Sequence, residues 1–595
     1  MLRVTLLISM LIYTIAFLIS CNGGGANNIG SGSPSGSSAE SGGGTISFSD
    51  ITYSRPDTVK LYAELSSAAV LIRNSKDDLS HLVEVVESAD RAYSSYLTMY
   101  SYAELMHNKD SSDDFYQNEY SVLSKAYSDL YTARTRLSYE ILCSEHKEEL
   151  SKIGFTDTVP FKIADPDRIS DDYFSLISHE EKLKYSYLTL SERNVYITYD
   201  GITDTCYSTI NRLKEALGDG SQKFSQAVEK CQELYLEALT NQKLSIYASL
   251  INTRSLIASS LGYDSYNDYA YDVLNYTHTA EDYKEYAEEI LEYMSPVYND
   301  LSIKIFNPYF KNHFPKFLDK NTLLTNLLSI YKTIDARIYS AFGSMISAGL
   351  FDIASGETAK NGSSYVAYFN SKHMPFLFHK AYGDARDYLS VSYGFGNYFD
   401  IFVNKVPDDS SYETELIAKA LEMITLSKLL ESLDTDDSKY VYYLSMKGVM
   451  REMIYSSLLS LAEQTIYDMN PDDVNGESIA LVLNNIAEKY SFLDPTIAEM
   501  LRNELVLTPK SLQAKTISFS YAAKIYFDID DAKSKLQIYE ALIDRANEKT
   551  LTSVLSSFGI SSPFEEGTVM DLSDKIFYSI NGYHYYKSNS DNSVA

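Results

Sequence analysis

Residues 113–139 read DDFYQNEYSVLSKAYSDLYTARTRLSY, and the spacing of their apolar and tyrosine side chains indicates the fold. These side chains recur at steps of three, four and seven residues, at Tyr116, Tyr120, Leu123, Tyr127, Leu130, Tyr131 and Leu137. Such steps place side chains on one face of a helix. The segment is therefore predicted to form one long amphipathic helix with a buried face.

The same periodicity recurs along the rest of the chain. It covers residues 213–252, 279–294, 323–345, 413–433, 440–467 and 534–546. Strand-like stretches are rare, and the best candidates are residues 364–370 and 375–380. The pattern predicts an all-α protein with one small β element.

Composition narrows the class of protein. The chain has 595 residues, of which 45% are hydrophobic and 22% charged, as in globular proteins. Its 81 acidic and 51 basic residues give a net charge of −30, which would repel a phosphate backbone. Nucleic-acid binding is therefore not expected.

The first 21 residues have the features of an export signal. Arg3 precedes an apolar run that ends in Leu18-Ile19-Ser20-Cys21, an ending that resembles a bacterial lipobox. We predict a lipoprotein signal peptide over residues 1–20 and lipidation, with palmitate as a component, of Cys21. The alternative is an uncleaved membrane anchor. Both place the body outside the cytoplasmic membrane, attached to the cell envelope.

Composition also suggests the domain boundaries. Residues 21–48 are rich in Gly and Ser and are predicted to form a flexible tether. A helical region over 49–204, a larger helical domain over 205–587 and a disordered tail over 588–595 are expected to follow. Beyond Cys21 there are only Cys143, Cys206 and Cys231. They form no C-x-x-C motif, and sequence leaves their pairing open.

Common catalytic motifs are missing from the sequence. His179-Glu180 begins like H-E-x-x-H, but Leu183 stands where the second histidine would be. There is no Walker-type loop and no G-x-S-x-G. His373 and His379 would share one face of a strand, although two ordinary polar residues explain them better than a metal site does.

Three stretches resemble the thimet oligopeptidase and oligoendopeptidase F family of zinc peptidases. They are NTRSLIASSLGYDSYNDYAYDV (252–273), SSYVAYFNSKHMPFLFHKAYGDARDYLSVSYGFGNYFD (363–400) and FGISSPFEEGTVMDLSDKIF (558–577). In the middle stretch Pro375, Phe376, Gly383, Arg386 and Asp387 fit the family's strand pair and the start of its metal-binding helix. The resemblance implies an elongated, two-lobed helical body with a deep channel.

The family's metal-binding motif is degenerate in this chain. Where the family has His-Glu-Phe-Gly-His, residues 393–397 read Tyr-Gly-Phe-Gly-Asn. The slots of the two histidines and the glutamate therefore hold Tyr393, Asn397 and Gly394. Only the third ligand has a counterpart, Glu422, which lies 29 residues after Tyr393.

This replacement has a chemical consequence. A catalytic zinc of this type needs two neutral imidazoles, a carboxylate and an open position for water. A phenol with a pKa near 10 and an uncharged amide are poor zinc ligands, and Gly394 supplies no general base. No catalytic residue and no zinc or other cofactor are therefore predicted, although zinc is the family's cofactor.

Three functions remain open at this stage. The first is a lipid-anchored pseudopeptidase that binds short peptides in its channel, for which Tyr365, Asp387, Tyr521 and Tyr526 are candidate lining residues. The second is an active metallo-oligopeptidase that holds its metal with Glu422 and other residues, His373 or His379 among them. The third is a structural envelope lipoprotein without a ligand. The family is enzymatic, but this copy is expected to be inactive.

Overall fold

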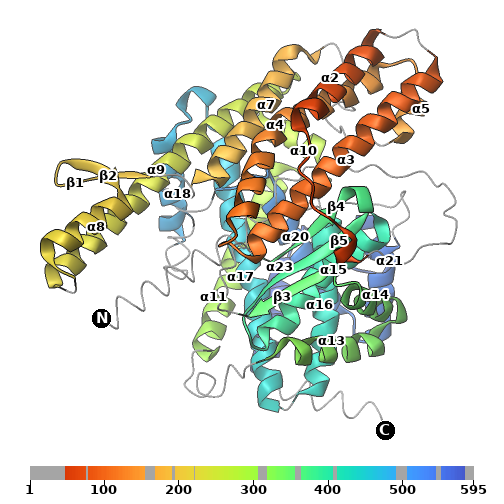
Figure 1. Ribbon diagram of the computed structural model, residues 1–595. Helices are drawn as coiled ribbons and strands as arrows, with labels where there is room; N and C mark the ends of the chain where they lie inside the picture. Colours follow the sequence, from red (N-terminus) through yellow and green to blue (C-terminus); the bar gives the residue numbers. More distant parts are fainter. Residues whose placement is uncertain are drawn as a thin grey trace.

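The computed structural model describes residues 47–74, 78–153, 168–190, 195–219, 221–305, 318–355, 364–405, 412–433, 435–490, 501, 505–544 and 551–582. The predicted signal peptide, Cys21, almost all of the predicted tether and the C-terminal tail lie outside these residues. The described part is mainly helical with two small sheets, which confirms the predicted fold class (Figure 1).

The N-terminal helices form a bundle with its own hydrophobic core. They are α2 (Thr58–Asn74), α3 (Leu79–Lys109), α4 (Asp114–Cys143) and the short α5 (Lys147–Leu150), and the bundle occupies the upper part of Figure 1. Asp113 starts α4 by accepting hydrogen bonds from the amides of Phe115 and Tyr116. The predicted face of α4 is buried through Leu123, Leu130 and Leu137.

A second group of elements connects the bundle to the body. It comprises α7 (Asp171–Leu188), β1 (Tyr196–Tyr199), β2 (Ile202–Thr205), α8 (Cys206–Leu217), α9 (Gln222–Ser260) and α10 (Tyr266–Val273). The hairpin β1–β2 and α8 project to the left in Figure 1. The single helix predicted over 213–252 is wrong, because Gly218 turns the chain with φ +79° and Ser221 caps a new helix.

The body holds the remaining helices, and these surround the largest hydrophobic core. They are α11 (Ala280–Ile305), α13 (Lys320–Ile334), α14 (Ala336–Ser347), α15 (Arg386–Asn404), α16 (Tyr412–Ser432), α17 (Thr435–Tyr467), α18 (Gly476–Lys489), α20 (Ser511–Asp528), α21 (Ala532–Ile543), α22 (Leu551–Ser557) and α23 (Thr568–Asn581). The helix predicted over 323–345 is two helices, because Asp335 ends α13 and caps α14. Short 3-10 turns lie at Phe48–Asp50, Ser151–Ile153, Asn370–Lys372 and Pro471–Asp473.

A three-stranded sheet leads into α15. Its strands are β3 (Phe351–Ser355), β4 (Tyr365–Phe369) and β5 (Met374–Ala381), in the order β3-β5-β4. The central strand β5 runs antiparallel to β4, with Val366 opposite Leu377, and parallel to β3. The two predicted strands are confirmed. Sequence reasoning missed β3, since five residues that include Asp352 show no clear alternation.

Two further predictions concern organisation. The division at residues 204 and 205 falls at the end of β2, where Thr205 pairs with Tyr196, and the domain limits stay a prediction. No helix in the described ranges is both long and apolar enough to cross a bilayer. All three cysteines in the described residues are free thiols, with the Cys206 Sγ 3.6 Å from the carbonyl oxygen of Cys231.

Candidate functional site

The turn between β5 and α15 is fixed by Asp387. Its carboxylate accepts hydrogen bonds from the amides of Tyr382 (2.8 Å) and Gly383 (2.7 Å), and His379 Nε2 lies 3.1 Å from its Oδ1. Gly383 permits the turn with φ +78°. Asp387 is 1% exposed, so the prediction that it lines a channel is wrong. It positions the start of α15.

Two glycines let α15 pack closely against its neighbours. A Cβ added to Gly396 would lie 2.6 Å from the Cα of Ala418 on α16, a contact that backbone cannot relieve. A Cβ added to Gly394 would lie 2.7 Å from the Cδ1 of Leu377 on β5, which is the movable end of a side chain. Gly396 is therefore required by the α15–α16 approach, and Gly394 is favoured by the contact with β5.

Tyr393, predicted to stand in the first histidine slot, contacts helix α16. Its hydroxyl donates a hydrogen bond to Glu415 Oε2, and its ring meets the Phe519 ring edge-on at a centroid distance of 6.2 Å. The Lys419 ammonium lies 4.3 Å from the centre of the Phe519 ring and 5.4 Å from that of Tyr393. The phenol thus takes part in a network of protein groups on three helices, α15, α16 and α20.

Glu422, the predicted counterpart of the third ligand, pairs with a lysine. Lys419 Nζ lies 2.7 Å from Glu422 Oε2, and both side chains are buried. Burial raises the pKa of Glu422, and the Lys419 charge opposes this rise. The carboxylate that reaches Tyr393 is Glu415, two helical turns before Glu422. Glu422 approaches Tyr393 through Lys419, which lies over the Tyr393 ring. That Glu422 is the counterpart of the third ligand stays a prediction, and Glu415 is a second carboxylate at the same slot.

A second ion pair lies close to the first. Lys515 Nζ on α20 is 2.8 Å from Glu452 Oε2 on α17. Burial would raise the pKa of Glu452, but the charges of Lys515 and Arg451 outweigh it and lower that pKa. Each of the two carboxylates, Glu422 and Glu452, therefore already has a lysine partner from the chain.

Asn397, at the second histidine slot, carries an unused acceptor. It lies one helical turn after Tyr393, so both side chains leave the same side of α15. Among the described residues, its Oδ1 atom is buried and accepts no hydrogen bond. A buried unsatisfied carbonyl costs free energy, which makes Asn397 a local weak point of the site.

These residues do not fit a zinc ion. The three motif slots contain no imidazole and no carboxylate, while Glu422 is already paired with an ammonium group. Within the described ranges, no cluster of three His, Cys, Asp or Glu side chains has metal-binding geometry. His379 is buried between Ser364 and Asp387, and His373 lies in the turn before β5, near Tyr368. The two histidines therefore do not converge on Glu422.

The predicted lining tyrosines lie in different surroundings. Tyr365 on β4 accepts a hydrogen bond from Asn108 of the N-terminal bundle at 3.1 Å. Tyr521 is buried on α20 beside Ser562 and Glu565. Tyr526 packs against Phe527, with Lys535 over its ring. That these three tyrosines line one channel stays a prediction.

An aromatic cluster that sequence reasoning missed lies at the start of α16. We call Tyr271, Tyr276, His278, Tyr412 and Phe564 the aromatic cluster. His278 stacks between the rings of Tyr276 (5.0 Å) and Phe564 (4.6 Å), and its Nε2 is 3.4 Å from the Tyr412 hydroxyl. Burial lowers the pKa of His278 to about 4, so the ring is neutral at pH 7. Tyr412 is three residues from Glu415, which places the cluster beside the site.

The missed residues leave only weak signals in the sequence. Glu415, Lys419 and Glu422 are spaced by four and three residues, which places them on one face of a helix. The acidic segment Tyr412-Glu413-Thr414-Glu415 therefore offered a second candidate carboxylate. The aromatic cluster joins segments separated by more than 100 residues, so no local pattern predicts it.

Comparisons with known proteins agree with this architecture. Residues 48–159 match the model of the Peptidase M3 N-terminal domain. No protein with a curated description matches the chain.

Solved structures match over almost the whole chain. A protein assigned as oligoendopeptidase F shares 18% identity with a TM-score of 0.68, covering 90% of this chain and 99% of its own. PZ peptidase A, solved with an inhibitor, has 18% sequence identity and a TM-score of 0.67. The match covers 90% of this chain and 99% of that one. A protein from Bacillus anthracis, also assigned as oligoendopeptidase F, has 19% sequence identity and a TM-score of 0.65. The match covers 90% of this chain and 98% of that one. The chain therefore has the fold of the oligoendopeptidase F-like helical peptidases.

Proposed function

We propose that this protein is a pseudopeptidase: it binds short peptides with a peptidase fold, does not hydrolyse them, and is held at the outer side of a membrane by a lipid on Cys21. The observation that carries the proposal is the hydrogen bond from Tyr393 to Glu415. It engages the residue predicted to stand in the first histidine slot with a carboxylate of α16, so this side chain already has a partner within the protein.

The neighbouring charges support the absence of hydrolysis. Metallopeptidase chemistry needs a metal-activated water and a general base within reach of it. Here Gly394 stands at the base slot, and Lys419 neutralises Glu422 at 2.7 Å. Lys419 lies on the same helix as Glu422, and its positive charge balances the Glu422 carboxylate.

Two features support binding of peptides. The partly buried rings of the aromatic cluster offer apolar faces beside Glu415, and such surfaces accept apolar side chains. Strand β4 is at an edge of its sheet, so its outer backbone groups are of the kind that pair with an extended peptide. The expected ligand is an extended peptide with at least one aromatic or large apolar residue.

Membrane attachment is supported by sequence alone. The run that ends in Ser20-Cys21 and the Gly/Ser-rich segment after it have the order of a lipoprotein signal and tether. Such a tether would hold the body away from the bilayer and leave it open to peptides outside the cell.

A binding experiment tests the proposal. A library of fluorescent peptides of about 6 to 12 residues would be titrated with the protein and followed by anisotropy. We expect saturable binding that Tyr276→Ala and Tyr412→Ala weaken by up to about tenfold each, since one aromatic contact is worth roughly 0.5–1.5 kcal/mol. Tyr207→Ala is the matched control, because Tyr207 on α8 is 77% exposed.

Two outcomes would count against the proposal. No saturable binding across the library would remove the peptide ligand and leave a structural envelope protein. Equal weakening by Tyr207→Ala would show that the binding surface is not the aromatic cluster.

A further inference from the structure

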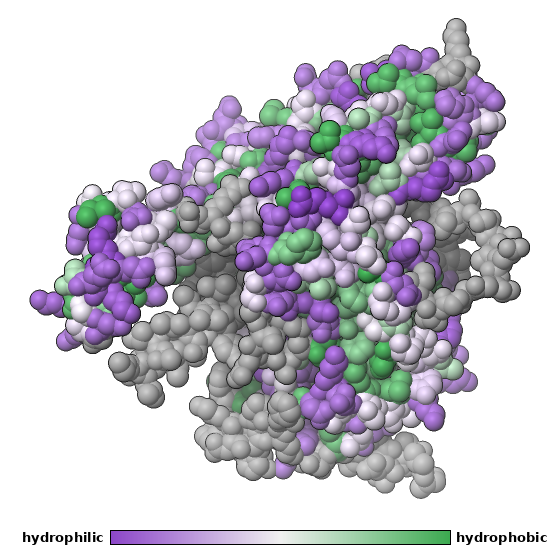
Figure 2. Space-filling model, in the orientation of Figure 1, coloured by the Kyte–Doolittle hydropathy of each residue, from purple (hydrophilic) through white to green (hydrophobic). Residues whose placement is uncertain are grey.

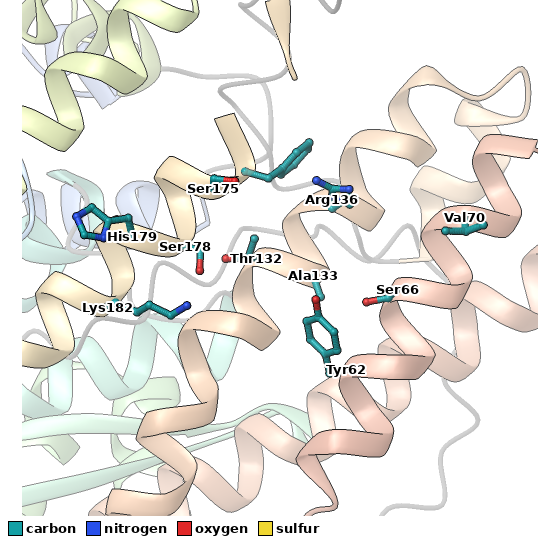
Figure 3. Close-up of a pocket in the computed structure, with 11 residues that line it drawn as sticks. Tyr62, Ser66, Val70, Thr132, Ala133, Arg136, Ser175, Ser178, His179 and Lys182 are labelled. Atoms are coloured by element: carbon teal, nitrogen blue, oxygen red, sulfur yellow. The ribbon is translucent and has the colours of Figure 1, made fainter. Parts of the chain in front are cut away.

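The N-terminal bundle contains a cavity that lies outside the peptidase-like site. Its volume is about 590 Å³, and it lies between α2, α4 and α7 (Figure 3). Cavities of about 300–1,000 Å³ are the usual size for small organic ligands. Its lining residues are Tyr62, Ser66, Val70, Thr132, Ala133, Arg136, Phe174, Ser175, Ser178, His179 and Lys182.

The lining has a charge opposite to that of the whole protein. Arg136, Lys182 and His179 are basic, and none of the lining side chains formed by the described residues is acidic. The chain carries 81 acidic and only 51 basic residues, so a purely basic lining is unexpected. In Figure 3, Lys182 and Ser178 from α7 point toward Thr132 and Ser66 on the other two helices.

Arg136 is held in place with donors to spare. Its guanidinium lies 4.6 Å from the centre of the Phe174 ring, and one nitrogen pairs with Asp171 at 2.6 Å. A guanidinium carries five N–H donors in a planar fork that matches phosphate oxygens. Lys182 pairs with Asp129 at 3.0 Å, and both acidic partners are largely exposed. Exposed ion pairs of this kind are weak, so an anion in the cavity can replace the aspartates.

The rest of the lining suggests an organic group. Tyr62 and Val70, about half exposed on α2, form an apolar wall, each one helical turn from Ser66. Figure 2 shows hydrophobic residues scattered among hydrophilic ones on the upper part of the molecule, where the bundle lies. The hydroxyls of Ser66 and Ser178 add donors near the basic groups.

We propose that this cavity binds a phosphate monoester whose phosphate lies between Arg136 and Lys182 and whose organic group contacts Tyr62 and Val70. Two basic side chains and the nearby hydroxyls match the charge and the several acceptor oxygens of a phosphate better than those of a single carboxylate. A soluble organic phosphate and the headgroup of a lipid both carry this chemistry.

Calorimetry with phenyl phosphate tests the proposal. We expect saturable binding that weakens at higher salt, since charged groups dominate it. Arg136→Gln and Lys182→Gln should each weaken binding by about tenfold, the effect of losing one charged hydrogen-bond partner. Ser66→Phe should weaken it as well by filling the cavity while the charges remain.

Matched controls come from the same bundle. Arg91→Gln on α3 and Lys60→Gln on α2 remove basic groups from exposed ion pairs with Glu87 and Glu64, away from the cavity lining. We expect both to bind like the parent. Circular dichroism of every variant separates loss of binding from loss of folding.

A vesicle arm distinguishes the two sources of phosphate. If phosphatidic acid vesicles bind the protein in an Arg136-dependent manner while phenyl phosphate does not, the ligand is a lipid headgroup. If phenyl phosphate binds, the ligand class is a soluble monoester. Failure of both probes, or equal binding by Arg136→Gln and Arg91→Gln, would overturn the proposal without affecting the peptide site.

Discussion

The Tyr393 hydroxyl on α15 donates a hydrogen bond to Glu415 on α16, across the interface between these two helices. The bond connects two residues 22 positions apart and leaves Glu422 to pair with Lys419. Tyr393, which is predicted to stand in a histidine slot, therefore contributes to the packing of α15 against α16. This hydrogen bond therefore has to be replaced if residues 393–397 are to be mutated into a zinc site.

The triple change Tyr393→His, Gly394→Glu and Asn397→His should create a zinc site. Two imidazoles one turn apart would then face a carboxylate on α16. We expect a dissociation constant in the micromolar range or below, about −8 kcal/mol or tighter, measured by competition with a zinc indicator. Because the new Cβ at position 394 would lie 2.7 Å from Leu377 Cδ1, adding Leu377→Ala should improve folding of the variant.

Replacing each of the two carboxylates on α16 in turn is the control for the triple variant. In the triple variant, Glu415→Gln should remove most of the gained zinc affinity, and Glu422→Gln should change it little. The reverse result would identify Glu422 as the third ligand. A triple variant that folds and binds no more zinc than the parent would show that the placement of these slots is wrong.

Gly396→Ala should destabilise the protein. The added methyl would lie 2.6 Å from the Ala418 Cα, and overpacking of this kind typically costs about 1–3 kcal/mol. Gly448→Ala on α17 is the matched control, because its Cβ would meet nothing within 4 Å. That change should be neutral or stabilise by up to about 1 kcal/mol. Urea unfolding of both variants would contradict the prediction if Gly396→Ala were as stable as the parent.

Arg254 should be a major determinant of stability. It is fully buried, pairs with Glu180 at 2.8 Å and donates to the Tyr467 hydroxyl at 2.7 Å. Arg254→Met leaves Glu180 without its guanidinium partner, a loss expected to cost about 3–5 kcal/mol. Denaturant unfolding measures it, and a cost below about 1 kcal/mol would contradict the assignment.

Glu180 predicts how stability depends on pH. Burial alone would raise its pKa, but the charges of Lys184 and Arg254 outweigh burial and lower the pKa to about 2. A lowered pKa in the folded state stabilises the protein above about pH 4.5, and this contribution is lost as pH falls toward 2. Glu180→Gln should therefore lose less free energy of unfolding than the parent between about pH 5 and 2. An identical slope in both proteins would argue against it.

Cys21→Ser should prevent lipid attachment. The prediction depends on the apolar run and the Ser20-Cys21 ending, and metabolic labelling with an alkyne fatty acid measures it. The parent should be labelled and the variant should not. A variant that is still labelled would mean that another residue is modified or that the signal was misread.

The sequence predicted the all-α fold class well, because the spacing of apolar residues reflects directly which helix face is buried. Residues 113–139 and 413–433 gave α4 and α16 within a few residues. It failed where a single residue ends a helix, at Gly218 and Asp335, since the apolar pattern continues past both breaks. The short strand β3 needed its parallel partner β5 to be recognised.

The site was predicted only in part. The assignment of residues 393–397 to the ligand slots stays a prediction, and the structure adds that Tyr393 and Asn397 lie one turn apart on α15. Glu415 and Glu422 lie two turns apart on one face of α16, so which of them contacts Tyr393 depends on how far α16 is shifted along α15. The close approach of Gly396 to Ala418 fixes that position. Asp387 could not be recognised as a buried turn residue, since its hydrogen-bond partners are backbone amides.

The central claim is that the protein holds peptides and leaves them intact. The most direct test incubates the protein with zinc and a peptide that it binds. The complex is then separated by size-exclusion chromatography, and the mass of the co-eluting peptide is measured by mass spectrometry. We expect the intact peptide mass, in the same amount with or without zinc. Shortened fragments that disappear when Glu415→Gln replaces the parent would contradict it and establish an active peptidase.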